Sequence, residues 1–158
     1  MALKEAIVVA EDTLHAFTAH SDRCGALIEY RATVFPVRSV PYIHTIRTTG
    51  YQISPGATYV WQGASAHGSS VQAAVQIARA MKYGPILLCG CPMNAEGYFN
   101  QGTVLTGFRY DRQRIGDTPK SPHAEKMRQK LQIYLAGVSR VWSMSGWTRE
   151  LLGLPPNS

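Results

Sequence analysis

The residues best suited to chemistry form two short groups that flank one predicted helix. His67, Gly68, Ser69 and Ser70 precede the helix, and Gly90-Cys91-Pro92-Met93 follows the strand after it. Free backbone N–H groups at a helix start, together with the helix dipole, can hold a phosphate without a basic side chain. The alternative is that Ser69 or Ser70 only caps the helix. The sequence leaves these two interpretations equally open.

The elements between these groups predict half of a βαβ unit. Apolar residues near a 3.6-residue period predict a helix from Ser69 to Lys82, which Gly84 should end in a left-handed C-cap. The run Ile86–Cys89 has no alternation, which is typical of a strand covered on both faces, and Thr58–Trp61 predicts the strand before the helix. Ligands of such sheets bind outside the carboxyl ends of the strands, where both groups should meet.

The remaining elements are predicted from periodicity and composition. Apolar spacing favours an N-terminal helix, and β-branched and aromatic residues favour strands. We expect a helix over 3–17, strands over 26–30, 42–47 and 138–142, and helices over 122–136 and 147–152.

Further polar residues could join the ligand site. Ser143 and Ser145 follow the last predicted strand, and Arg149 could bind a phosphate, with a surface ion pair as the alternative. His44, Thr45 and Arg47 could face a ligand or be ordinary polar surface.

Two segments carry a resemblance to known families. The pattern Gly68-Ser69-Ser70, a helix, and a strand closing in Cys89-Gly90-x-Pro92-Met93 resembles uncharacterised Rossmann-like proteins of phages and prophages. More distantly it is similar to the nucleotide-sugar half of bacterial sialyltransferases. Residues 143–153 also resemble the tail of those phage proteins. The resemblance implies a three-layer Rossmann-like α/β fold with a mainly parallel sheet, and a nucleotide-type ligand.

The chain departs from that pattern at its start. It contains no Gly-x-Gly-x-x-Gly, and its first glycine is Gly25, so the first βα unit of the family could be lacking. Position 91 is Cys, and no acidic residue follows until Glu96, so sialyl-transfer chemistry does not carry over. Whether the protein is an enzyme is left open.

Composition bounds the class of protein. The 158 residues predict one α/β domain over residues 1–153 with a disordered tail over 154–158. A hydrophobic fraction of 45% and a charged fraction of 16% fit a compact domain that forms a homo-oligomer. No apolar run approaches the roughly 20 residues of a membrane span, so we expect no membrane partner and a cytoplasmic protein, in the host cytoplasm if it is phage-encoded.

Cysteine usage agrees with a reducing compartment. Cys24, Cys89 and Cys91 cannot all pair, and we expect Cys89 to pack in the interior. The spacing does not match a structural zinc site, and we expect no metal and no cofactor.

Positive charge invites a nucleic-acid interpretation. The formal charge is +6, and basic residues gather between Arg109 and Lys130, near Phe108 and Tyr110. However, Met127, Leu131 and Leu135 form one stripe of the 122–136 helix, which favours a solvated amphipathic helix over a nucleic-acid surface.

The leading hypothesis is therefore a phage-type Rossmann-like protein that binds a nucleotide or nucleotide-derived molecule at His67–Ser70 and Gly90–Met93, and that could be a degenerate transferase. The alternative is a phage accessory or structural protein that acts through self-association or protein contacts.

Overall fold

The computed structural model describes residues 1–3, 10–47, 52–53, 55–64, 69–89 and 122–156. It divides the chain into two compact units, unit 1 over Met1–Tyr83 and unit 2 over Gly84–Ser158. Both units combine helices with short parallel strands, so the α/β class is confirmed. The single domain over 1–153 stays a prediction.

Unit 1 is built on a four-stranded parallel sheet. Its strands lie in the order β1 (Ala2–Leu3), β2 (His15–Thr18), β3 (Tyr42–Ile46) and β4 (Tyr59–Trp61). The strands predicted over 42–47 and 58–61 are confirmed, and each neighbouring pair is parallel. All carboxyl ends therefore meet at one edge of this sheet, and all amino ends at the other.

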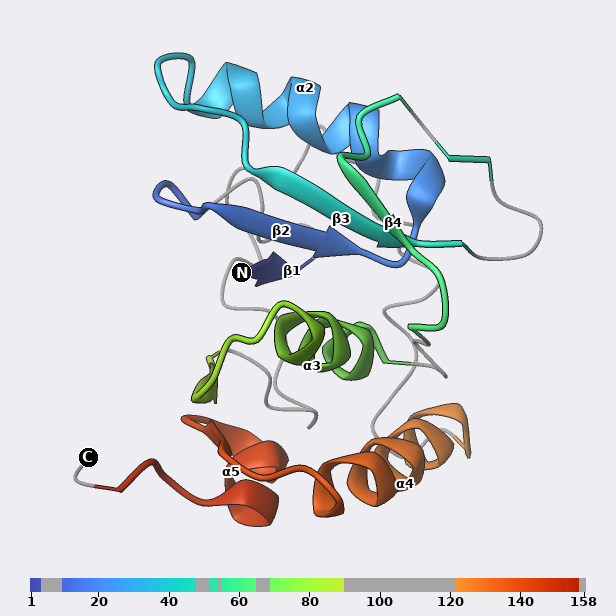
Figure 1. The fold of residues 1–158 in the computed structure, drawn as a ribbon, viewed down its shortest axis with the longest axis vertical. Helices are drawn as coiled ribbons and strands as arrows, with labels where there is room; N and C mark the ends of the chain where they lie inside the picture. Colours follow the sequence, from blue (N-terminus) through green and yellow to red (C-terminus); the bar gives the residue numbers. More distant parts are fainter. Residues whose placement is uncertain (4–9, 48–51, 54, 65–68, 90–121, 157–158) are drawn as a thin grey trace. The chain divides into compact units, whose positions relative to one another are not determined.

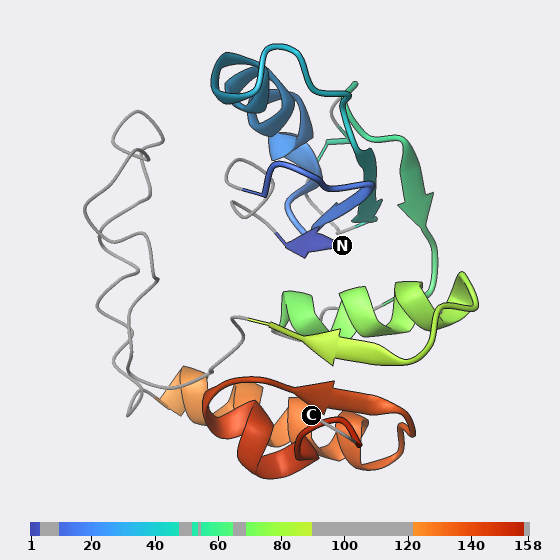
Figure 2. The same ribbon diagram turned by 90° about the vertical axis from the view of Figure 1, so that its left-hand side faces the viewer.

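Two helices cover opposite faces of the sheet (Figures 1 and 2). Helix α2 (Cys24–Val34) follows the short 3-10 turn η1 (Ser21–Arg23) and lies on one face, and α3 (Ser70–Ala80) lies on the other. Phe17 and Ile46 pack against Ala73 and Ile77 of α3 in one buried cluster. The helix predicted over 69–82 is confirmed as α3, and its apolar stripe packs against this core.

The N-terminal predictions are wrong in two places. Residues 2–3 and 15–18 are strands rather than parts of a helix, and the predicted strand over 26–30 is the middle of α2. Ala16 and Phe17 are both fully buried, so β2 shows no alternation that would have marked it as a strand. In α2, Cys24, Leu27 and Arg31 are buried at helical spacing.

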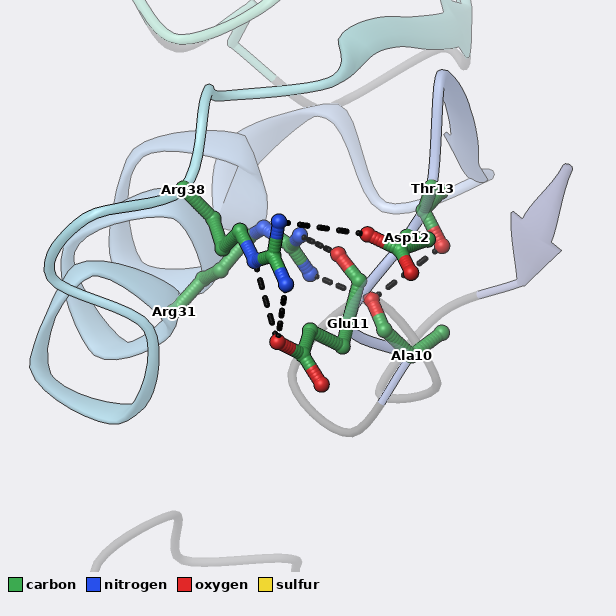
Figure 3. Close-up of polar contacts among 6 residues, drawn as sticks. All are labelled: Ala10, Glu11, Asp12, Thr13, Arg31 and Arg38. Atoms are coloured by element: carbon green, nitrogen blue, oxygen red, sulfur yellow. Dashed lines mark hydrogen bonds and ion pairs between the residues drawn. The ribbon is translucent and has the colours of Figure 1, made fainter.

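A buried arginine fastens the loop before β2 to α2 (Figure 3). The Arg31 guanidinium donates from Nη1 to the carbonyl of Ala10 at 2.7 Å and from Nη2 to the carbonyl of Glu11 at 2.6 Å. Outside it, Arg38 makes a two-pronged contact with one carboxylate oxygen of Glu11, at 2.9 Å from Nε and 2.6 Å from Nη2. Glu11 and the more distant Asp12 both raise the pKa of Arg38, chiefly through the Glu11 hydrogen bond. These contacts fix where the chain enters β2.

Unit 2 pairs two short parallel strands with two helices. Strand β5 (Ile86–Leu88) pairs with β6 (Val141–Ser143), and the helices are α4 (Pro122–Ala136) and α5 (Gly146–Leu152). Leu131 and Leu135 of α4 are buried, and the Arg128 guanidinium lies over the Trp147 ring of α5 at 6.0 Å. The predicted amphipathic helix over 122–136 and the short helix near 147–152 are confirmed.

Four details of this region differ from prediction. Strand β5 does not complete the predicted βαβ unit with β4, because the two strands lie in different sheets and β5 pairs with β6 alone among the described residues. Leu87 is 46% exposed, so β5 is not covered on both faces. Cys89 is exposed rather than packed. The last strand is Val141–Ser143 instead of 138–142, because Val138 still belongs to the turn that ends α4 through its N–H bond to the Leu135 carbonyl.

No helix in the described part of the chain is long and apolar enough to cross a bilayer.

Candidate functional site

Six ring side chains of unit 1 form what we call the histidine–tyrosine cluster: His15, Tyr42, His44, Tyr59, Trp61 and Tyr83. Strand alternation and register explain five of them. Side chains two apart on a strand share a face, and the parallel register sets His15 beside Tyr42 and His44 beside Tyr59. Phe17 and Ile46, on the same face, pack against α3. The cluster therefore occupies the α3 side of the sheet, toward the amino ends of the strands.

The C-terminal end of α3 supplies the sixth ring. The N–H of Tyr83 bonds to the carbonyl of Ala78 at 2.9 Å and that of Lys82 to Arg79 at 2.8 Å, the two bonds of a Schellman motif. The left-handed residue of the motif is Lys82, with φ 62, so the prediction that Gly84 would take this place is wrong. This turn brings the Tyr83 ring to His15, at 5.7 Å between ring centroids.

A chain of hydrogen bonds runs through the cluster. Trp61 Nε1 donates to His44 Nδ1 at 2.9 Å, His44 Nε2 lies 3.0 Å from His15 Nδ1, and His15 Nε2 lies 3.1 Å from the Tyr83 hydroxyl. This series of hydrogen bonds starts at the Trp61 indole, passes through the buried His44 imidazole, which is 1% exposed, and ends at the Tyr83 phenol on the surface. It connects three strands to the end of α3.

Burial and charge keep both imidazoles neutral. Burial, with a smaller contribution from the neighbouring His15, lowers the pKa of His44 to about 4. Burial also lowers the pKa of His15, with a smaller contribution from the positive charge of the Met1 amino group. Near neutral pH the cluster therefore presents uncharged rings with fixed hydrogen-bonding partners.

The tyrosines give the cluster an aromatic surface. Tyr42, Tyr59 and Tyr83 are 47%, 48% and 50% exposed. Tyr59 stacks on His44 with the ring planes 25° apart and the centroids at 5.0 Å, and Tyr42 lies 6.1 Å from Tyr59. Such rings offer apolar faces to a planar ligand while their hydroxyl groups remain solvated.

The predicted residues at the start of α3 lie at the opposite, carboxyl edge of the sheet. The Ser69 hydroxyl accepts from the N–H of Val71 at 3.2 Å, and Ser69 is buried. This is the capping interaction that the sequence offered as one alternative. Ser70 is the first helical residue, and His67 and Gly68 lie outside the described residues.

The other predicted residues belong to unit 2. The Ser143 hydroxyl is fully buried and lies 2.7 Å from the Thr148 hydroxyl, so it links β6 to α5. Ser145 precedes α5, and Arg149 is exposed, with no ion pair to another described residue. Gly90–Met93 lies outside the described residues.

The three polar residues His44, Thr45 and Arg47 of the predicted strand over 42–47 differ in burial. His44 and Thr45 are buried, and the Thr45 hydroxyl donates to the carbonyl of Thr18 at 2.8 Å, whereas Arg47 is exposed. Neither His44 nor Thr45 is therefore ordinary polar surface.

Sequence reasoning missed most of the cluster. Of the six rings, the sequence predicts a ligand contact only for His44, although Tyr42-x-His44 and Tyr59-x-Trp61 share a spacing of two that places both rings of each pair on one strand face. That repeated spacing was the signal available.

Within the described ranges, no three His, Cys, Asp or Glu side chains lie close enough together to hold a metal ion. Comparison with protein-family models, curated proteins and solved structures finds no match to the chain.

Proposed function

We propose that this protein binds a nucleotide or a nucleotide-derived small molecule, with the planar base packed on the histidine–tyrosine cluster. The observation that carries the proposal is the set of three half-exposed tyrosine rings that pack on two neutral imidazoles, Tyr59 on His44 and the other two on His15. A base stacked on a tyrosine ring gains about 1–3 kcal/mol. Neutral rings suit this role because a base is itself an uncharged aromatic surface.

Charge supports the same class of ligand. The chain carries a formal net charge of +6, and the exposed Lys82 directly precedes Tyr83. A positive field raises the local concentration of anionic ligands, and a phosphate attached to the base is such an anion. The positive charge beside the tyrosine rings thus supports the ligand class expected from the sequence.

The base surface and the predicted phosphate site at Ser69–Ser70 lie at opposite ends of α3. This helix has 11 residues, which at 1.5 Å per residue separates its ends by about 16 Å. We therefore assign the base to the Tyr83 end and leave the Ser69 end as a separate prediction. The Rossmann-like fold and the kinship with phage proteins are proposed on the sequence resemblance.

Ligand screening tests the proposal. Purified protein is scanned by thermal shift with AMP, GMP, CMP, UMP, their diphosphates and a nucleotide sugar, because a ligand that binds only the folded state raises its stability. We expect at least one compound to raise the melting temperature. Tyr42→Ala and Tyr59→Ala should then weaken its binding about 5- to 150-fold, as expected for a lost stacking contact.

Tyr30→Ala is the matched control, since Tyr30 lies on α2, which covers the other face of the sheet. It should bind as the parent does. If no compound in the panel shifts the melting temperature, or if both test variants bind like the control, base binding at the cluster is wrong.

A second candidate function is association with another copy of the chain through the same edge of the sheet. Leu14 and Val40, just before β2 and β3, are 64% and 55% exposed beside the half-exposed tyrosines. Exposed apolar residues in one place are typical of protein interfaces. Sedimentation equilibrium of the parent and of Leu14→Ser over a range of concentrations tests this, and a monomer at every concentration would exclude it.

A further inference from the structure

The Trp61 indole determines where the protons lie in the hydrogen-bonded series Trp61–His44–His15–Tyr83. An indole N–H can donate but never accept, so His44 Nδ1 must be the acceptor of the 2.9 Å bond from Trp61. A neutral imidazole carries one proton, so the proton of His44 lies on Nε2. That N–H points at His15 Nδ1, 3.0 Å away, and His15 Nδ1 must accept in its turn.

The same rule fixes the protons of His15 and of Tyr83 at the surface. With its Nδ1 accepting, neutral His15 holds its own proton on Nε2, and this N–H donates to the Tyr83 oxygen at 3.1 Å. The Tyr83 hydroxyl proton then has no place inside the chain and is directed outward. Protonating either imidazole would place two donors against each other, at Trp61 with His44 or at His44 with His15.

We infer that Trp61 is a positioning residue that fixes the proton positions of His44 and His15 and thereby makes the Tyr83 hydroxyl a hydrogen-bond donor toward the ligand. The part concerning the ligand rests on the proposed function. Because the Tyr83 oxygen already accepts from His15, its outward proton favours an acceptor on the ligand, such as a carbonyl oxygen, a ring nitrogen or a phosphate oxygen. A ligand amino group at the same point would have only the second lone pair of that oxygen to bind.

Among the described residues, few charged or titratable groups lie near His44 and His15. His44 faces Tyr59 of β4 and His15 of β2, and His15 faces Tyr42 of β3 and Tyr83 after α3. The Met1 amino group acts on His15 through its charge. No carboxylate is among these neighbours, so no described negative charge stabilises an imidazolium over the neutral imidazole.

Nitrogen NMR of the histidine side chains in the ligand-free protein tests the inference, because the ¹⁵N shifts of Nδ1 and Nε2 distinguish the two neutral forms and the cation. We expect His44 and His15 to be neutral at pH 7, each with the proton on Nε2. A proton on Nδ1 of either residue in the parent protein would overturn the inference, whether or not any variant folds.

Trp61→Phe keeps an aromatic ring and removes the donor. Without it, His44 and His15 can exchange the direction of their shared bond, and the population with a proton on His44 Nδ1 should rise at least about fivefold, the effect of one lost hydrogen bond. Trp142→Phe, in unit 2, is the matched control and should leave both histidines unchanged. Unchanged histidines in Trp61→Phe would show that the indole does not fix them.

Calorimetric titration with the four nucleoside monophosphates tests the contact with the ligand separately. Tyr83→Phe keeps the ring and removes the hydroxyl, so affinity should fall about 3- to 10-fold. Equal affinity in parent and variant would show that Tyr83 does not donate to the ligand. If no monophosphate binds the parent, the proposed function fails, while the NMR result still decides the proton positions.

Discussion

Acid should destabilise unit 1 through His44. This imidazole is 1% exposed, and burial lowers its pKa from 6.5 to about 4. On acidification the unfolded chain therefore takes up a proton near pH 6.5, whereas the folded protein does so only near pH 4. Between these values the unfolded state binds more protons, so the free energy of unfolding falls as the pH falls. The stabilisation is complete above the unfolded pKa and fully lost below the folded one.

The size of the effect follows from the two pKa values. A difference of about 2.5 in pKa, at about 1.4 kcal/mol per pKa unit, corresponds to about 3 kcal/mol. Urea unfolding between about pH 7 and about pH 4 measures it, with His44→Gln as the comparison because Gln can still accept from Trp61 but does not titrate. The parent should lose about 3 kcal/mol more than the variant over this range. Equal losses in the two proteins would refute the argument from burial.

Three further substitutions test the packing within the two units. Arg31→Lys cannot reproduce the two bonds to the loop before β2 and should cost about 1–3 kcal/mol in urea unfolding, whereas Arg23→Lys at an exposed position should cost little. Ser143→Ala removes the buried hydrogen bond to Thr148 in unit 2 and should lower stability by about 0.5–1.5 kcal/mol, measured in the same way. Gly56→Ala would place its Cβ 2.8 Å from a side chain and 2.9 Å from the backbone of α2, so it should destabilise by about 1–3 kcal/mol, while Gly137→Ala, with its nearest atom at 3.7 Å, should fold as the parent does. A Gly56→Ala protein as stable as the Gly137→Ala protein would show that α2 can shift to accommodate the added Cβ without loss of stability.

The elements that sequence predicted well are those whose signals are local. The helix Ser70–Ala80 has an apolar stripe and a capping serine, and Pro122–Ala136 has its stripe of leucines. Strand Tyr42–Ile46 is marked by β-branched and aromatic residues between turns. In each case the residues that define the element lie within a few positions of one another.

The elements that it missed depend on distant partners. Strand His15–Thr18 is recognisable only beside its neighbours, because its central residues are buried on both faces and give no alternation. Helix Cys24–Val34 carries the apolar run Ala26-Leu27-Ile28, which a short window cannot distinguish from a strand. Only packing against the sheet makes the spacing of its buried residues meaningful.

The sequence by itself determined the α/β class and most helix boundaries, because these follow from propensity and from periodicity within a few turns. The candidate site was decided by tertiary structure alone. His15 is 29 residues from His44 and 68 from Tyr83, and the register of β2 against β3 together with the turn after α3 sets their distances. Register is a property of paired strands, so no single segment of the chain contains it.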